Sequence, residues 1–157
     1  MINKNDFSVL YSPDKIEEII NQNTDVFYHK DVFRLIKHSE DSPLTTNDFV
    51  PSIMEYNNFS MPTYEKQNLK KNNEQFSMSC FDTKEHLNSY IESVTSLREG
   101  FQNNNWYIMK GCINKNKGFA DKPQESGPKI GHINYYLYDP INKNPIDDFE
   151  LLKEDDK

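Results

Sequence analysis

The sequence predicts an α+β fold, with one domain over residues 1–157 and an antiparallel or mixed sheet of about four to six strands packed against two or three helices. Three observations predict it. A length of 157 residues favours one core, and no repeat or linker divides the chain. Strand-like runs alternate with helical patterns. Aromatic residues make up 13% of the chain and supply a core, although only 35% of residues are hydrophobic.

The first third of the chain predicts one helix and one strong strand. Residues 12–14, Ser-Pro-Asp, are typical of a helix start, and isoleucines at helical spacing continue the pattern. Residues 26–28 and 32–36 favour strands, and the second run is the stronger. Because strand side chains alternate, Arg34 shares its face with Val32 and must be exposed at an edge or paired.

The next segment predicts a short helix, a loop and a strand. A helix of one or two turns is expected from Thr45 or Thr46, limited by Pro51. The polar residues 64–75 predict an exposed loop. Residues 75–81 alternate with the period of a strand. The two expected faces are Phe76, Met78 and Cys80 on one side and Ser77, Ser79 and Phe81 on the other.

The main helix is expected at about residues 83–98. Asp82 is the predicted N-cap, and Glu85 completes a capping-box pattern. Arg98 suits the C-terminal end, which Gly100 is expected to close. One apolar stripe at helical spacing predicts its buried side: Leu87, Tyr90, Ile91, Val94 and Leu97.

The last third predicts strands around a long loop. Residues 106–113 are apolar on both faces, as expected of a central strand. Residues 114–129 carry two glycines and two prolines and predict a loop. Residues 130–138 predict another strand, and Phe149, Leu151 and their neighbours a short last one. The tail, residues 152–157, is expected to fray.

Composition favours some function classes over others. The chain has 25 acidic and 18 basic residues and a net charge of −7. Such a balance argues against nucleic-acid binding and suits a basic protein partner, or simply solubility. The two cysteines do not make a disulfide framework. Without a signal-peptide pattern or a membrane-spanning run, the expected location is the cytoplasm.

The leading functional hypothesis is a small non-enzymatic module that binds a basic protein. Its candidate binding residues are Trp106, Tyr136 and Tyr138. The histidines lack the spacing of zinc ligands, so no metal is expected, and without a glycine-rich phosphate loop no cofactor is expected under this hypothesis. The sequence leaves open whether the chain is an enzyme.

His132 is the first candidate for catalysis. It begins a predicted strand after a glycine-rich loop and shares a face with Asn134, Tyr136 and Tyr138. A histidine beside tyrosines suits general acid–base chemistry in a metal-free hydrolase or nuclease. The alternative is that His132 hydrogen-bonds a loop and the tyrosines pack half-buried.

A second candidate set consists of Arg34, the Ser77 and Ser79 pair, and Glu150, which occur in this order on three predicted strands. The order resembles that of the Arg-Ser-Glu class of ADP-ribosyltransferases. The resemblance implies Arg34 on the phosphates of NAD, a serine shaping the nicotinamide pocket, and Glu150 stabilising an oxocarbenium-like state. Met78 departs from that family, which has a small or hydroxyl residue between the serines. The structural alternatives are an ion pair for Arg34 and a solvent face for the serines.

Overall fold

The structure is a computed structural model that describes residues 2–9, 11–23, 25–37, 43–56, 73–103 and 106–152. Its six strands form one sheet in the order β4-β5-β2-β1-β3-β6, and every neighbouring pair is antiparallel. The strands are β1 (Val32–Lys37), β2 (Ser77–Phe81), β3 (Trp106–Gly111), β4 (Gly118–Ala120), β5 (His132–Leu137) and β6 (Phe149–Leu151). With the helices, this sheet confirms the predicted α+β fold.

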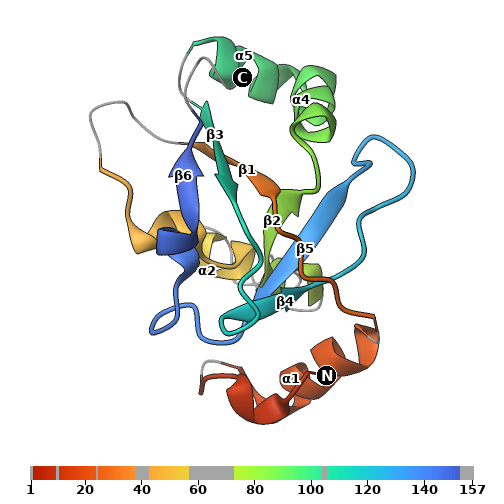
Figure 1. The fold of residues 1–157 in the computed structure, drawn as a ribbon, viewed down its shortest axis with the longest axis vertical. Coiled ribbons are helices and arrows are strands. Elements are labelled where there is room, and N and C mark those ends of the chain that lie inside the picture. The colour runs from red at the N-terminus through yellow and green to blue at the C-terminus, as the bar shows by residue number, and fades with distance from the viewer. Residues whose placement is uncertain are drawn as a thin grey trace.

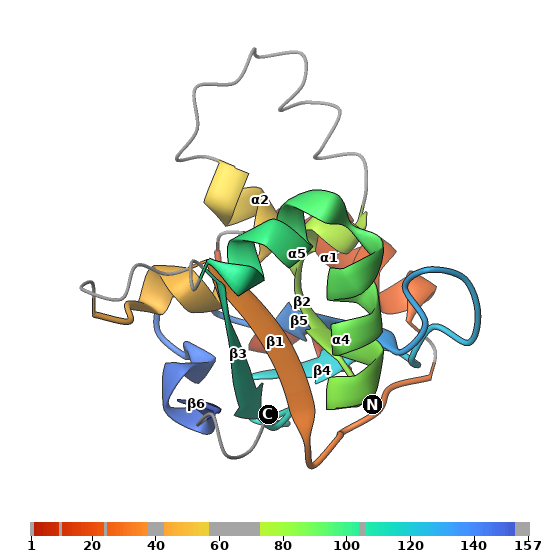
Figure 2. The same ribbon diagram turned by 90° about the horizontal axis from the view of Figure 1, so that it is seen from above.

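The helices pack around the sheet (Figure 1). They are α1 (Pro13–Gln22), α2 (Ser52–Tyr56), α4 (Lys84–Ser93) and α5 (Thr95–Gln102), with 3-10 turns η1 (Lys4–Asp6), η2 (Thr46–Phe49), η3 (Asn73–Phe76) and η4 (Pro145–Asp148). Figure 1 shows α4 and α5 at one end, α1 at the other and α2 beside the middle of the sheet, and Figure 2 shows α4 and α5 from above. None of the helices in the described part of the chain is long and apolar enough to cross a membrane.

The sheet is buried on both faces. The side we call the core face carries one cluster that includes Val32, Ile36, Phe49, Met78, Cys80, Met109, Ile133, Tyr135 and Leu137. The opposite side, the helix face, carries two clusters. One packs against α4 and α5 around Phe81, Leu87, Ile91 and Ile108. The other packs against α1 around Ile19, Phe119, Tyr136 and Tyr138.

The seam at the middle of the sheet is short. Strands β1 and β3 are in register over six residue pairs, and β2 and β5 over five. By contrast, β1 and β2 share one registered pair, Phe33 with Phe81. The three-stranded halves β4-β5-β2 and β1-β3-β6 are therefore joined by little backbone pairing.

The expected main helix is interrupted, and this prediction was wrong in three details. Val94 has extended backbone angles, φ −117° and ψ 112°, and separates α4 from α5. The N-cap is Thr83 rather than Asp82, because its side chain accepts a hydrogen bond from the His86 amide at 3.0 Å. Gly100 lies inside α5, where the Trp106 ring occupies the space that a Cβ would need.

Other predicted limits of strands and loops also differ from those in the structure. Phe27 makes only an isolated bridge to Ala120, so residues 26–28 are not a strand. The predicted loop 114–129 contains β4, which pairs with β5. Phe76 belongs to η3 rather than to β2. Leu152 is buried and its amide donates to the Ile108 carbonyl at 3.0 Å, so the tail does not fray there. The rest of the tail lies outside the described residues.

The start of the chain follows the prediction closely. Ser12 caps α1, accepting a hydrogen bond from the Lys15 amide at 3.2 Å, and Pro13 occupies the first turn. The expected short helix near Thr45 is divided by Pro51 into η2 and α2. Most of the predicted loop 64–75 lies outside the described residues, and its last residues form η3.

Two glycines with the same backbone angle allow a matched test of packing. Gly131 and Gly127 have φ of 85° and 86°. At Gly131 a Cβ would collide with Asp82 Oδ1 and His86 Nδ1, whereas at Gly127 the nearest atom, Gln124 Nε2, lies 3.6 Å away. We expect Gly127→Ala to lower the free energy of unfolding by about 1 kcal/mol and Gly131→Ala by roughly 2–4 kcal/mol. Urea denaturation checks this, and equal losses would contradict it.

Candidate functional site

A groove crosses the ends of β1, β3 and β6 beside the start of α4. It consists of two adjoining hollows of about 620 and 370 Å³, which share Asp31, Lys110 and Glu150. Acidic residues in its lining outnumber basic ones two to one: Asp31, Asp82, Glu85, Asp147, Asp148 and Glu150 against Lys30, Lys84 and Lys110. Phe33, Phe149 and Leu152 add apolar surface. We call this feature the acidic groove.

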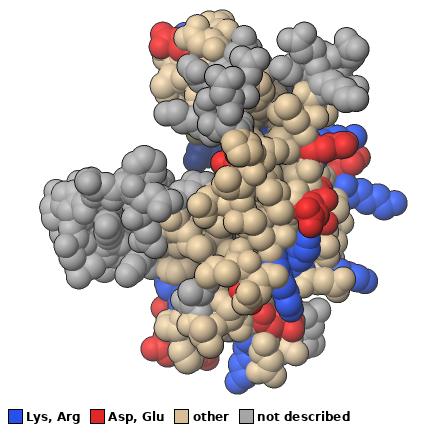
Figure 3. Space-filling model, turned by 90° about the vertical axis from the view of Figure 1, so that its left-hand side faces the viewer, with Lys and Arg blue, Asp and Glu red and all other residues tan. Residues whose placement is uncertain are grey.

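Strand register places the centre of the acidic groove. Phe33 on β1 is opposite Lys110 on β3, which is opposite Glu150 on β6, so the three side chains form a row on the helix face. Lys110 Nζ lies 3.9 Å from Asp31 Oδ1, and both side chains are exposed. An exposed pair of this length contributes little stability, so it does not fix either side chain firmly. Figure 3 shows the face at the left of Figure 1, where acidic and basic side chains lie close together along the right-hand edge.

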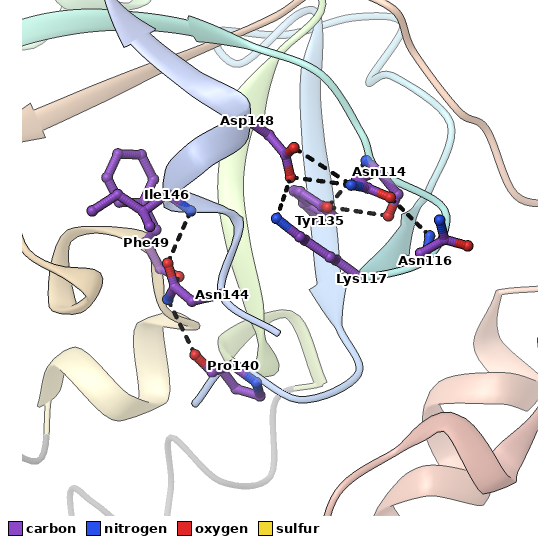
Figure 4. A network of polar contacts seen from close by, with 9 residues as sticks. All are labelled: Phe49, Asn114, Asn116, Lys117, Tyr135, Pro140, Asn144, Ile146 and Asp148. Carbon is purple, nitrogen blue, oxygen red and sulfur yellow. Dashed lines mark hydrogen bonds and ion pairs between the residues drawn. The ribbon is translucent and has the colours of Figure 1, made fainter. Parts of the chain in front are cut away.

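One end of the groove is rigid because Asp148 belongs to a polar network (Figure 4). Its carboxylate accepts hydrogen bonds from Asn114 Nδ2 at 3.4 Å and pairs with Lys117 Nζ at 3.0 Å. The Tyr135 hydroxyl accepts from the Asn114 amide at 3.2 Å. This network ties the turn after β3 to η4, so Asp148 is already neutralised within the fold.

Asn144 fixes η4 from its other end, also visible in Figure 4. Its Oδ1 accepts from the Ile146 amide at 3.0 Å, which caps the turn. Its Nδ2 lies near the carbonyls of Phe49 at 2.9 Å and Pro140 at 3.1 Å. The side chain therefore joins η4 to η2, and the lining that η4 gives to the acidic groove is held in place.

His132 and Ser79 meet on the helix face. Ser79 Oγ lies 2.7 Å from His132 Nε2, across the paired strands β2 and β5. Burial, and to a lesser extent the charge of Lys129, lower the pKa of His132 from its ordinary 6.5 to about 4. The imidazole is therefore neutral at pH 7. A neutral ring beside a hydroxyl has the arrangement of a general base, and its low pKa makes it a weak one at pH 7.

Ser77 has a different environment although it shares the face. It is 2% exposed, and its hydroxyl lies 2.7 Å from the Glu74 carbonyl and 2.9 Å from Asn134 Oδ1. Asn134 in turn donates from its amide and its Nδ2 to the Asp121 carboxylate, both at 2.7 Å. Burial nevertheless raises the pKa of Asp121. Ser77 is thus part of a buried structural network.

Arg34 is buried on the core face, where it is 6% exposed. Its Nη1 donates to the Ser79 carbonyl at 2.8 Å, and its Nε and Nη2 donate to the Asp48 carbonyl at 3.3 and 3.2 Å. Of the two sequence-based alternatives, paired or edge-exposed, the structure shows the first. Its partners include backbone carbonyls, and it lies on a central strand.

The residues of the ADP-ribosyltransferase pattern do not share one cleft among the described hollows. Arg34 points to the core face, whereas Ser77, Ser79 and Glu150 belong to the helix face by strand alternation. Glu150 lines the acidic groove, and neither Arg34 nor the serines do. A phosphate-binding cation and a catalytic carboxylate are therefore separated by the sheet.

The three aromatic candidates for partner binding serve the fold. Tyr136 and Tyr138 are 1% and 4% exposed and pack with Phe119 at ring-centroid distances of 5.2 and 5.9 Å. Trp106 packs against Gly100. Large aromatic surfaces that remain exposed lie elsewhere, at Phe27 and Tyr28.

No metal centre is present in the described ranges, where no group of three or more His, Cys, Asp or Glu side chains could hold an ion. His86 Nδ1 lies 2.7 Å from Asp82 Oδ1. Cys80 and Cys112 are free, and burial raises the pKa of both thiols. His38 lies outside the described residues.

Comparisons with protein-family models, curated proteins and solved structures give no match to this chain. A proposal of function therefore depends on the geometry and charge of its own residues.

Of the residues that the acidic groove brings together, the sequence singled out Glu150 for another role and missed Asp31 and Lys110. Asp31 and Lys110 lie 79 positions apart, and Asp82 stood out only as a helix cap. Strand order and register join them, and neither is visible in local patterns. An acidic residue directly before a predicted strand, as in Asp31-Val32, is the one local signal of a strand end.

The neutral state of His132 predicts a pH dependence of stability. The unfolded chain binds a proton on this ring near pH 6.5, but the folded chain resists it until about pH 4. The contribution is therefore complete above pH 6.5 and is lost as the pH falls through this window, by roughly 3 kcal/mol at most. His132→Gln should retain a polar partner for Ser79 and show a smaller loss. Denaturant titrations at pH 7 and pH 4.5 check this; identical losses for both proteins would contradict it.

Proposed function

We propose that this chain is a binding protein that takes a basic, extended segment of a partner protein into the acidic groove. The observation that carries the proposal is the excess of carboxylates over lysines in the lining of the two adjoining hollows, which remains when Asp148, paired with Lys117, is left out. Carboxylates accept charge-assisted hydrogen bonds from lysine and arginine, which makes a basic segment the complementary occupant.

The apolar surface in the groove favours a peptide ligand over a free cation. Phe33 is half-buried, and Leu152 is 9% exposed, beside Lys110 and Glu150. An arginine or lysine lays its aliphatic stem along such surface while its charged end reaches a carboxylate. The exposed Asp31 and Glu150 side chains are free to turn toward it, because the Asp31–Lys110 contact is long.

The overall charge acts in the same direction. A net charge of −7 attracts a basic partner before contact, and the groove then selects the segment that fits. Contacts of this type govern the association rate and its salt dependence more than the final affinity. The mode of binding therefore predicts an association rate that falls as salt is added.

Charge reversal inside and outside the groove tests the proposal. The probe is a fluorescein-labelled peptide of alternating arginine and alanine, measured by fluorescence anisotropy at roughly 0.15 M ionic strength, where the Debye length is about 8 Å. Asp31→Lys combined with Glu150→Lys should weaken binding at least about tenfold, because two groove carboxylates become repulsive. The control, Glu92→Lys with Glu99→Lys, makes the same change in net charge on exposed positions of α4 and α5.

The control pair separates the groove from general electrostatics. It should weaken the same peptide by less than about threefold, because exposed charges beyond a Debye length are screened. Equal weakening by both pairs, or no peptide binding by the unmodified protein, would contradict the proposal.

A further inference from the structure

Ser79 and His132 are in contact although they are not opposite each other in the sheet. Ser79 is opposite Asn134 in the register, and His132 is opposite Phe81, so the imidazole reaches diagonally to the hydroxyl. The 2.7 Å separation is that of a nucleophile and its general base. Both side chains keep part of their surface exposed, unlike Ser77.

The backbone at Ser79 is held from the other side of the sheet. Arg34 Nη1 donates to its carbonyl at 2.8 Å, so the residue is fixed while its hydroxyl faces His132. The histidine is also held: the Phe81 ring lies edge-on to it, with centroids 5.4 Å apart, and Tyr90 stacks on Phe81. Pre-positioned groups of this kind need little reorganisation before reacting.

The surroundings supply a cation next to an aromatic surface. Lys129 Nζ lies 5.7 Å from the centroid of the Tyr90 ring, and its charge acts on His132. A lysine in this position favours the neutral imidazole.

We propose that Ser79 and His132 form a nucleophile–base pair that hydrolyses activated carboxylic esters, an activity separate from binding in the acidic groove. Ser79 Oγ bonds to the ester carbonyl carbon while His132 Nε2 takes the hydroxyl proton. The bond to the leaving alcohol breaks, and the alcohol receives that proton. Water then attacks the acylated Ser79, His132 takes a proton from the water, and the acid leaves as the proton returns to Oγ.

A fluorophosphonate probe on the unmodified full chain tests this directly, because it forms a covalent bond with an activated serine oxygen. Intact-mass and peptide mass spectrometry should find one adduct, on Ser79. Ser79→Ala should abolish it, and His132→Gln should slow it at least about 100-fold. Ser93→Ala should have no effect, since the Ser93 hydroxyl is exposed and only donates to the Tyr90 carbonyl.

The rate of p-nitrophenyl acetate hydrolysis gives a second readout. The Ser79→Ala and His132→Gln variants should lose this activity as they lose probe labelling, and Ser93→Ala should keep it. Thermal unfolding establishes that each variant is folded. The proposal is overturned by an unmodified protein that forms no Ser79 adduct, or by labelling that is unchanged in a folded His132→Gln variant.

Discussion

The guanidinium group of Arg34 joins the two halves of the sheet. Only Phe33 and Phe81 are a registered pair between β1 and β2, so the backbone pairing along this seam is short. Arg34 reaches across from β1 and donates to the Ser79 carbonyl on β2, and it also donates to the Asp48 carbonyl of η2. A buried carbonyl without a donor costs free energy, which makes this cation part of the sheet's own hydrogen bonding.

The same arrangement explains where polar chemistry occurs. The core face is filled by one apolar cluster, with Arg34 accommodated through hydrogen bonds. On the helix face, α4 and α5 cover one cluster and α1 covers another. Ser79 and His132 lie on this face, on the strands β2 and β5. The acidic groove forms at the ends of β1, β3 and β6, where neighbouring strands bring charged residues together from distant parts of the sequence.

Local patterns predicted most of the elements and few of the contacts. Alternation located β2, and apolar runs located β1, β3 and β5, because side chains on a strand report its two faces. The cap at Ser12 is a local hydrogen bond and was predicted correctly. Three-residue β4 was missed because its strand conformation depends on pairing with β5. The break at Val94 was missed because the apolar stripe continues through it.

The candidate site shows the same division. His132 and Ser79 were each selected from the sequence, but for different reactions, and only the register of β2 with β5 shows that they touch. Arg34 was selected as a ligand for NAD phosphates. Strand alternation explains why Arg34 is buried on the opposite face from Glu150. Its role between β1 and β2 could not be predicted, because the sequence does not show which strands are neighbours.

The most direct test of this structural role is the free energy of unfolding of Arg34→Met, with Arg98→Met as the control. The Arg98 side chain only donates to the Glu92 carbonyl at an exposed position. We expect Arg34→Met to lose roughly 2–4 kcal/mol and the control less than about 1 kcal/mol. Millimolar NAD should leave the melting temperature of the unmodified protein unchanged. An Arg34→Met variant as stable as the unmodified protein, or an NAD-dependent rise in melting temperature that this variant loses, would contradict the account.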